Sequence, residues 1–262
     1  AGYIGSVAAH ILLERDFEVT VLDDLSTGRK KLVADGARFV EGSILDKNAI
    51  QLALGECEAV MHFAAKSLVG ESVEKPELYE LVNVGGSKNL FAKMKALGIS
   101  KIVLSSTAAT YGEPKRVPIS ENDEPAPKNP YGATKLEIDR MVAASGFSAI
   151  SLRYFNVAGA YQAKSGWLME DHTPETHLIP RILQNLNDFH IYGKDYSTPD
   201  GTCIRDYIHV DDVANAHIKA AGRLLTGKQC HTINLGTGKG YSVKEIVNLV
   251  EKITGQRVKY EF

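Results

Sequence analysis

Short, almost continuously apolar segments alternate with amphipathic segments through the first 160 residues. The clearest apolar segments are 59–65 and 101–107, and residues 77–97 between them have apolar side chains at helical spacing. Strands that are apolar on both faces belong to a parallel sheet covered by helices on both sides, and such sheets bind ligands at the carboxyl ends of their strands. The pattern predicts an α/β fold with a Rossmann-like, doubly wound parallel sheet.

The alternation of predicted strands and helices continues to about residue 160 and becomes less regular after it. After residue 160 the alternation is less regular and the polar loops lengthen. We therefore expect an NAD-binding Rossmann domain over residues 1–160 and mainly a smaller, substrate-binding C-terminal lobe over residues 161–262. The further predicted strands are 18–22, 37–44, 148–157, 190–192 and 232–235, and the further predicted helices are 46–54, 178–187, 211–225 and 242–254.

A glycine pair at the start of the chain predicts a dinucleotide site. Gly2 and Gly5 match the second and third glycines of G-x-x-G-x-x-G at a helix start. Asp23 ends the next strand about twenty residues later, where a carboxylate binds the adenosine ribose and disfavours a 2′-phosphate. This favours NAD over NADP. The same layout requires a strand before Ala1, so we expect the sequence to be a fragment, or the ordered part, of a longer chain.

Tyr131 and Lys135 form the candidate catalytic pair. Pro130 suits the first turn of a helix, and side chains four residues apart lie on one helical face. A neighbouring ammonium favours the phenolate and should lower the pKa of Tyr131 toward neutrality. Such a phenol can take a proton from a sugar or alcohol hydroxyl.

A second pair, Tyr111 and Lys115, has the same spacing. Gly112 and Pro114 predict a turn there, so the two side chains need not share a face. Helical context therefore favours Tyr131.

The strand 101–107 ends in three hydroxyl residues, Ser105, Ser106 and Thr107. Such residues at a strand end are ordinarily capping or turn residues. Because the next helix carries Tyr131, this strand end can also present a hydroxyl beside the phenol.

Two candidate ligand sites lie in the second half. Arg205 can pair with a phosphate in bidentate fashion, unless it forms a surface ion pair with Asp206 or Asp211. Residues 171–177 mix acids and histidines as a metal site does, but no further ligand pair of convincing spacing accompanies them. We predict no metal and keep zinc as the minority alternative.

Net charge, cysteine positions and apolar runs limit which partners we expect for the chain. The formal net charge of −2 gives no basic excess for nucleic acid or an anionic membrane surface. Cys57, Cys203 and Cys230 are too scattered for a disulfide framework, and no apolar run reaches membrane-spanning length. We expect a cytoplasmic protein whose partners are small molecules and itself.

Seven motifs together resemble one family over essentially the whole chain. They occur in the order found in UDP-glucose 4-epimerases of the extended short-chain dehydrogenase/reductase superfamily, which are isomerases of galactose and carbohydrate metabolism. The motifs are AGYIGS (1–6), VLDDLSTG (21–28), HFAA (62–65), SSTAATYG (105–112), PYGATK (130–135), LRYFNVAGA (152–160) and RDYIHV (205–210).

The resemblance implies reversible 4-epimerisation of UDP-glucose and UDP-galactose with tightly held NAD. Tyr131, as phenolate, would remove the proton of the sugar 4-hydroxyl while a hydride passes from C4 to the nicotinamide, leaving a 4-keto sugar. The intermediate would rotate, and the returned hydride would invert the centre. Lys135 would hold the nicotinamide ribose, and Thr107 would hydrogen-bond the 4-oxygen.

The resemblance also implies two sets of binding residues. Ser43 stands where the family often has an acidic residue on the adenine, so we expect that contact to be lost or mediated by water. The NAD set is Gly2, Tyr3, Ile4, Gly5, Asp23, Asp24, Leu25, Ser26, Thr27, Gly28, Ser43, Ile44, Phe63, Ala64, Ala65, Ser67, Asn83, Tyr131, Lys135 and Phe155. The UDP-sugar set is Thr107, Tyr131, Asn156, Thr176, His177, Leu178, Tyr192 and Arg205.

Other activities of related enzymes stay open to different degrees. An epimerase of UDP-GlcNAc and UDP-GalNAc is the nearest alternative, because the residue that gates this choice would lie past Phe262. A 4,6-dehydratase usually has an Asp-Glu pair where this chain has Ala108 and Ala109, and a decarboxylase commonly has a nearby Glu. A non-catalytic NAD-binding scaffold would not need Tyr131 and Lys135 intact.

The family also implies a homodimer. Its members pair through the helix that carries the catalytic Tyr and the neighbouring helix. We expect Leu90, Phe91, Met141 and Val142 to lie in that interface.

Overall fold

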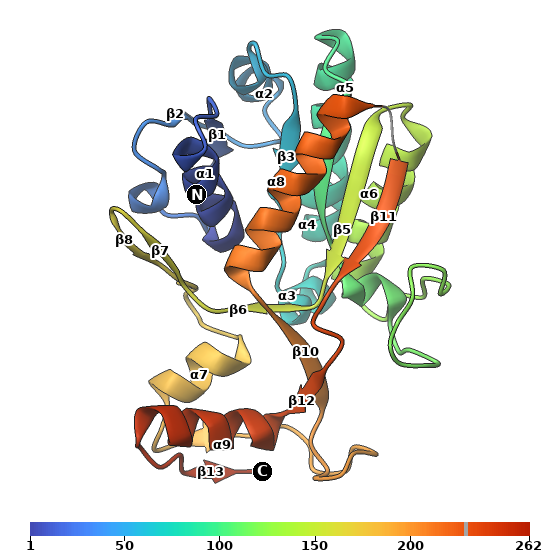
Figure 1. Ribbon diagram of the computed structural model, residues 1–262. Helices are drawn as coiled ribbons and strands as arrows, with labels where there is room; N and C mark the ends of the chain where they lie inside the picture. The colour runs from blue at the N-terminus through green and yellow to red at the C-terminus, as the bar shows by residue number, and fades with distance from the viewer. Residues whose placement is uncertain (228–229) are drawn as a thin grey trace.

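A parallel sheet with helices on both faces forms the larger part of the molecule, and a smaller C-terminal lobe extends from one end of it (Figure 1). The computed structural model describes residues 1–227 and 230–262. One sheet has the order β11-β5-β4-β3, and a separate pair, β1-β2, lies beside it. The strands are β1 Thr20–Asp23, β2 Arg38–Glu41, β3 Val60–His62, β4 Lys101–Thr107, β5 Ser148–Tyr154 and β11 Cys230–Leu235.

All pairings within these two sheets are parallel, which confirms the predicted fold class. Strand β4 has the predicted bounds 101–107, while β1, β2 and β3 differ from their predicted ranges by up to three residues at an end. The predicted strand 148–157 is really two strands. β5 ends at Tyr154, and β6 (Asn156–Ala158) pairs with β10 in a different sheet.

The two faces of the central strands are covered by different helices. Ile102 and Leu104 of β4 pack with helices α2, α5 and α6, whereas Val103 between them packs with α8. Because successive side chains of a strand point to opposite faces, a run of apolar residues serves both cores. The helices are α1 Tyr3–Glu14, α2 Lys47–Leu54, α3 Val69–Glu74, α4 Pro76–Tyr79, α5 Gly86–Ala96, α6 Pro130–Ala144 and α8 Val210–Thr226, with a π-helical segment Glu80–Gly85 between α4 and α5.

The residues expected in a helical dimer interface lie elsewhere. Leu90, Phe91 and Val142 are buried in the core between α5, α6 and the sheet, and Met141 packs against the same cluster. The prediction was wrong for these side chains because a helix on a sheet uses its apolar stripe for the sheet itself.

A gap separates the two parts of the sheet. Among residues 1–227 and 230–262, no strand hydrogen-bonds to both β1 and β3. The large cavity described below continues between them, where Val21, Val60 and Met61 line it.

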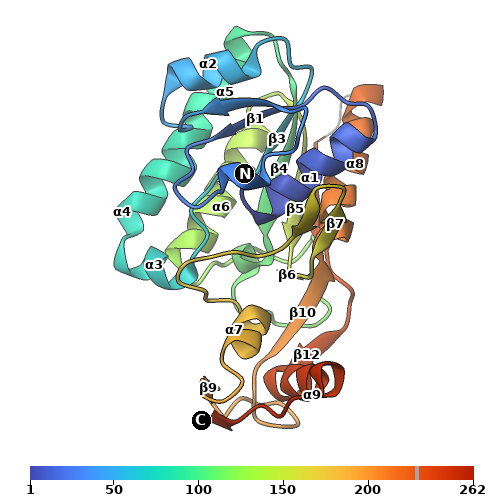
Figure 2. The same ribbon diagram turned by 90° about the vertical axis from the view of Figure 1, so that its left-hand side faces the viewer.

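The C-terminal lobe extends away from the main sheet (Figure 2). It has a small core of its own, which includes Ile182, Phe189 and Val247. The chain crosses the predicted division at residue 160 more than once, because α8 and β11 return to the main sheet. The lobe contains α7 Leu178–Gln184, β9 Phe189–His190, β10 Ile204–His209, β12 Gly240–Ser242, α9 Val243–Thr254 and β13 Tyr260–Glu261, and a hairpin of β7 Tyr161–Ala163 and β8 Gly166–Leu168 packs near α1.

Candidate active site

One cavity of about 2720 Å³ collects residues from the carboxyl ends of β1, β3, β4 and β5 and from the C-terminal lobe. It exceeds an ordinary ligand pocket because it continues between β1 and β3. Most of the residues predicted from the sequence line it. These are Gly2, Tyr3, Ile4, Gly5, Asp23, Asp24, Ser26, Thr27, Ser43, Ile44, Phe63, Ala64, Ala65, Ser67, Thr107, Tyr131, Lys135, Phe155, Asn156, His177 and Arg205.

Six predicted binding residues are not among those that line this cavity: Leu25, Gly28, Asn83, Thr176, Leu178 and Tyr192. Asn83 is fully buried and hydrogen-bonds with the backbone of Lys66, so it holds the loop after β3 in place. Gly28 packs against Asp23, where a Cβ atom would lie 2.6 Å from the carboxylate. Leu178 packs against the core of the C-terminal lobe. Tyr192 is 73% exposed, on that lobe, beside Arg181. Thr176 is exposed and Leu25 only partly buried.

The N-terminus of α1 offers an anion site at one side of the cavity. Gly2 is the N-cap, no side chain caps the helix, and its first turn has no acidic residue. The backbone N–H groups of the first turn therefore have no side-chain acceptor, and the helix dipole favours a negative charge there. No atom lies within 4 Å of a Cβ position at Gly2, which leaves room for a ligand.

Asp23 stands beside this helix end. Its Oδ1 accepts the N–H of Leu25 at 2.8 Å, and its Oδ2 accepts from the amino group of Ala1 at 2.9 Å. A carboxylate has about four acceptor positions, so it can also accept ribose hydroxyls. Asp24 follows directly, and the two acids together would repel a 2′-phosphate. The N-terminus of α1, Gly2 and Asp23 together form a site that suits NAD.

Helix α6 carries the catalytic candidates on the opposite side of the cavity. It begins at Pro130, and the side chain of Asn129 accepts the N–H of Gly132 at 2.8 Å. A Cβ atom on Gly132 would lie 2.6 Å from the carbonyl oxygen of Ala109, so the glycine lets the helix pack directly on the 3-10 helix that follows β4. This contact brings Tyr131 and Thr107 to the same end of the sheet.

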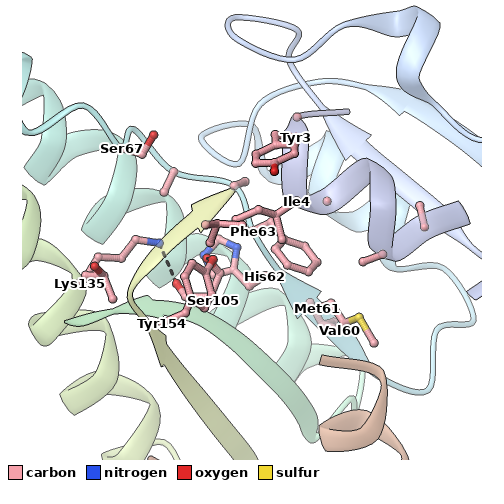
Figure 3. Close-up of a pocket in the computed structure, with 18 of the residues that line it drawn as sticks. Tyr3, Ile4, Val60, Met61, His62, Phe63, Ser67, Ser105, Lys135 and Tyr154 are labelled. Carbon is pink, nitrogen blue, oxygen red and sulfur yellow. Dashed lines mark hydrogen bonds between the residues drawn. The ribbon is translucent and has the colours of Figure 1, made fainter. Parts of the chain in front are cut away.

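Lys135 points from α6 toward the end of β4 (Figure 3). Its Nζ donates a hydrogen bond to the carbonyl oxygen of Ser105 at 2.8 Å. Tyr154 lies beside this contact and hydrogen-bonds with the Ser105 hydroxyl. Tyr154 is not among the site residues predicted from the sequence. Tyr154 ends β5 and pairs with Thr107 of β4 in the sheet register. Its place at a strand end beside the predicted hydroxyl is the feature that could have identified it.

The structure contradicts the predicted lowering of the Tyr131 pKa. Burial raises the pKa of Tyr131 to about 12, and a hydrogen bond with Thr107 opposes this rise. Burial also lowers the pKa of Lys135 to about 8, which the charge of Asp139 opposes. The ammonium contacts Ser105, so it does not bring the phenol toward neutrality as the spacing alone predicted.

Arg205 is available for a ligand phosphate. Its guanidinium donates to the carbonyl oxygen of Ile204 at 2.8 Å and, within the described part of the chain, forms no ion pair with a carboxylate. Asp206, the alternative partner, instead accepts hydrogen bonds from Thr237 and Gly238. The surface ion pair is therefore not formed.

A Rossmann-like sheet that opens on a dinucleotide cradle and a Tyr-Lys pair on one helix face belongs to nicotinamide-dependent enzymes of sugar and alcohol chemistry. Comparison with known proteins narrows this class. Residues 1–236 match the model of the NAD dependent epimerase/dehydratase family. The chain belongs to this family, and NAD is its cofactor.

The chain is similar to several named relatives. It is 48% identical to the UDP-glucose 4-epimerase of Corynebacterium glutamicum, and the match covers 100% of this chain and 80% of that protein. Its structure is similar to that of the UDP-glucose 4-epimerase from Brucella ovis in complex with NAD, with a TM-score of 0.94 and 43% identity over 100% of this chain and 82% of that one. For the enzyme from Bifidobacterium longum in complex with NAD⁺ and UDP, the TM-score is 0.91 and the identity 31%, over 100% of this chain and 83% of that one.

No helix among the described residues is both long and apolar enough to cross a membrane.

Proposed function

We propose that the chain interconverts UDP-glucose and UDP-galactose by inverting C4 of the sugar. The observation that carries this proposal is the placement of Tyr131 and Thr107 in the same cavity as the dinucleotide cradle. Relatives named UDP-glucose 4-epimerase, 42–48% identical over nearly the whole chain, support the choice of substrate.

Tyr131 moves the proton of the reaction. Thr107 Oγ1 accepts the N–H of Ala109 at 3.1 Å, so its own proton is free to be donated to the phenol oxygen or to the sugar 4-oxygen. When bound, NAD supplies a reversible hydride acceptor, so the sugar passes through a 4-keto form without net redox change. Tyr131 takes the 4-hydroxyl proton as the ketone forms and returns it when the ketone is reduced from its other face.

The phenol needs help to act as a base, because burial raises its pKa to about 12. Lys135 lies one helical turn away on the same face of α6. If its ammonium moves from the Ser105 carbonyl toward Tyr131, it stabilises the phenolate. Arg205 and Asn156 line the part of the cavity that is formed with the C-terminal lobe, where they can bind the uridine diphosphate.

Incubation of the purified chain with NAD and UDP-galactose tests this function. We expect UDP-glucose as the product. A 4-keto-6-deoxy sugar would indicate a dehydratase instead, and this is disfavoured because Ala108 and Ala109, which line the cavity, cannot transfer protons. No conversion would contradict the proposal. UDP-GalNAc in a parallel reaction measures the preference between glucose-type and N-acetylated sugars.

We also propose a homodimer, on a different surface from the one the sequence suggested. Val69 and Val73 of α3 and Leu81 of the π-helical segment are 46%, 63% and 57% exposed, and α3 contacts α6. Exposed apolar side chains grouped on neighbouring helices favour association. A cytoplasmic location stays a prediction. It is supported by Cys57, Cys203 and Cys230, which are all free thiols.

A further inference from the structure

Four side chains converge in the connection between β8 and α7. The Nδ1 atom of His177 lies 2.9 Å from Glu170 Oε1 and 3.0 Å from Glu175 Oε1. The Nδ1 atom of His172 lies 3.4 Å from Glu170 Oε1 and 3.9 Å from Glu175 Oε2. One ligand atom from each residue lies within 4.8 Å of all the others.

These separations suit a metal ion with four protein ligands. Zinc takes imidazole nitrogen and carboxylate oxygen at about 2.0–2.2 Å in tetrahedral geometry, which places neighbouring ligand atoms about 3.3–3.6 Å apart. The nitrogen–oxygen separations in the cluster, from 2.9 to 3.9 Å, bracket this value. Imidazole ligands favour zinc and its transition-metal neighbours over magnesium or calcium, which take oxygen ligands.

Hydrogen bonding within the cluster leaves one nitrogen atom without a partner. His177 Nδ1 can donate to both carboxylates, whereas His172 Nδ1, 3.4 Å from Glu170 Oε1, is buried and forms no hydrogen bond. The side chains of Glu170 and Glu175 are only 8% and 4% exposed. Two carboxylates so far from water require a nearby positive charge, and a divalent cation would supply it while using the unpartnered nitrogen.

We propose that Glu170, His172, Glu175 and His177 bind one divalent transition-metal ion of the zinc class. This departs from the expectation that the chain holds no metal. Residues 171–177 alone lack a complete ligand set, and the fold adds Glu170 from just outside that stretch. The inference goes beyond the proposed function and does not rest on it, because the ion has no part in the proton or hydride transfer.

The proposed metal site lies at one end of the cavity. Glu170, His172 and His177 line the cavity, and His172 also borders a smaller pocket that includes Ser26 and Ser67. Asp171 is not part of this group, and its carboxylate lies 3.8 Å from Arg29. An ion with only protein ligands is typical of a structural site. Its expected role is to fix the connection between the sheet and the C-terminal lobe.

Zinc binding by the full chain tests the proposal. The purified protein is stripped with a chelator, equilibrated with zinc, and analysed for bound metal by elemental mass spectrometry. We expect about one zinc per chain, as four protein ligands complete a structural site. Cobalt should bind in its place and give the visible absorption of a tetrahedral centre. Magnesium at equal concentration should not compete.

His172→Gln and Glu175→Gln should each weaken zinc binding at least tenfold, because each removes a ligand from the set. His190→Gln is the matched control. His190 is an exposed histidine 3.9 Å from Asp188 and lies outside the cluster, so this variant should bind zinc as the original chain does.

Two results would overturn the proposal. One is the absence of stoichiometric zinc in the original chain. The other is equal binding by His172→Gln and His190→Gln, which would indicate adventitious surface binding. Circular dichroism in chelator shows whether each variant folds. If His172→Gln is unfolded, Glu170→Gln decides, since it keeps the shape of the side chain and removes its charge.

Discussion

At the scale of single residues, the reactivity of Tyr131 depends on burial as much as on its neighbours. The side chain lies in a cavity where burial raises its pKa to about 12, and the one opposing contact is the hydrogen bond with Thr107. Lys135 is held at the Ser105 carbonyl, 2.8 Å away. The phenol is therefore positioned for proton transfer, while its deprotonation depends on where the lysine ammonium lies.

Tyr131→Phe should lower the rate of UDP-galactose epimerisation by about 10²–10⁴-fold, because it removes the group that transfers the proton. Binding of NAD, measured by fluorescence quenching, should persist. Tyr111→Phe is the matched control. It removes a hydroxyl that donates to Asn234 at 2.8 Å, outside the catalytic pair. An undiminished rate in Tyr131→Phe would contradict the mechanism.

Lys135 also predicts a pH dependence of stability. Its pKa is about 8 in the folded chain and about 10.4 when unfolded. Between these values the unfolded chain binds more protons, so the free energy of unfolding contributed by Lys135 rises with pH. Relative to Lys135→Met, the original chain should gain at most about 3 kcal/mol between pH 8 and 10.

Urea unfolding at a series of pH values measures this difference. Lys88→Met, which removes an exposed lysine of α5, should show no such trend relative to the original chain. A difference between the original chain and Lys135→Met that stays constant from pH 7 to pH 10 would show that the Lys135 ammonium is well solvated.

At the scale of elements, α6 is held on the sheet by a buried polar network. Asp139 Oδ2 accepts hydrogen bonds from Ser106 of β4 and from Arg153 of β5, each at 3.0 Å. The side chains of Asp139 and Arg153 are each 6% exposed. Since the same helix carries Tyr131 and Lys135, this network also fixes the candidate catalytic pair relative to the strand ends.

Asp139→Asn should lower the free energy of unfolding by about 3–5 kcal/mol, because it leaves the Arg153 guanidinium buried without a countercharge. Chemical denaturation measures the loss. Asp123→Asn makes the same substitution at the surface ion pair with Arg116 and should change stability little. If both variants lose the same stability, the buried network does not hold α6.

At the scale of the whole molecule, the candidate active site lies where two regions meet. The sheet provides the dinucleotide cradle and the helix that carries Tyr131 and Lys135, and the C-terminal lobe provides Arg205. The lobe has its own core around Ile182 and Val247. Cavities between two regions are common sites for ligands, because each region contributes groups that the other lacks.

The proposed homodimer is tested by Leu81→Lys. A lysine at this exposed apolar position should shift sedimentation from dimer toward monomer, because it places a charge in the interface. Leu52→Lys is matched to it, since Leu52 of α2 is also 57% exposed but lies on a different surface. Identical sedimentation of the two variants would place the interface elsewhere or show that none forms.

The sequence by itself determined the fold class and much of the site. Apolar periodicity located β4 and α6, and the residues at the strand ends, such as Asp23 and Thr107, could be assigned to one edge of a parallel sheet. These inferences depend on the spacing of residues along the chain. In a helix or strand, this spacing decides on which face each side chain lies.

Only the tertiary structure decided which of these groups meet and in what environment. It placed Asn83 in the interior, turned Phe91 toward the sheet, raised the pKa of Tyr131, and gathered Glu170 with His177. Desolvation and long-range contacts depend on elements far apart in the chain, and the spacing of residues along the sequence does not specify them.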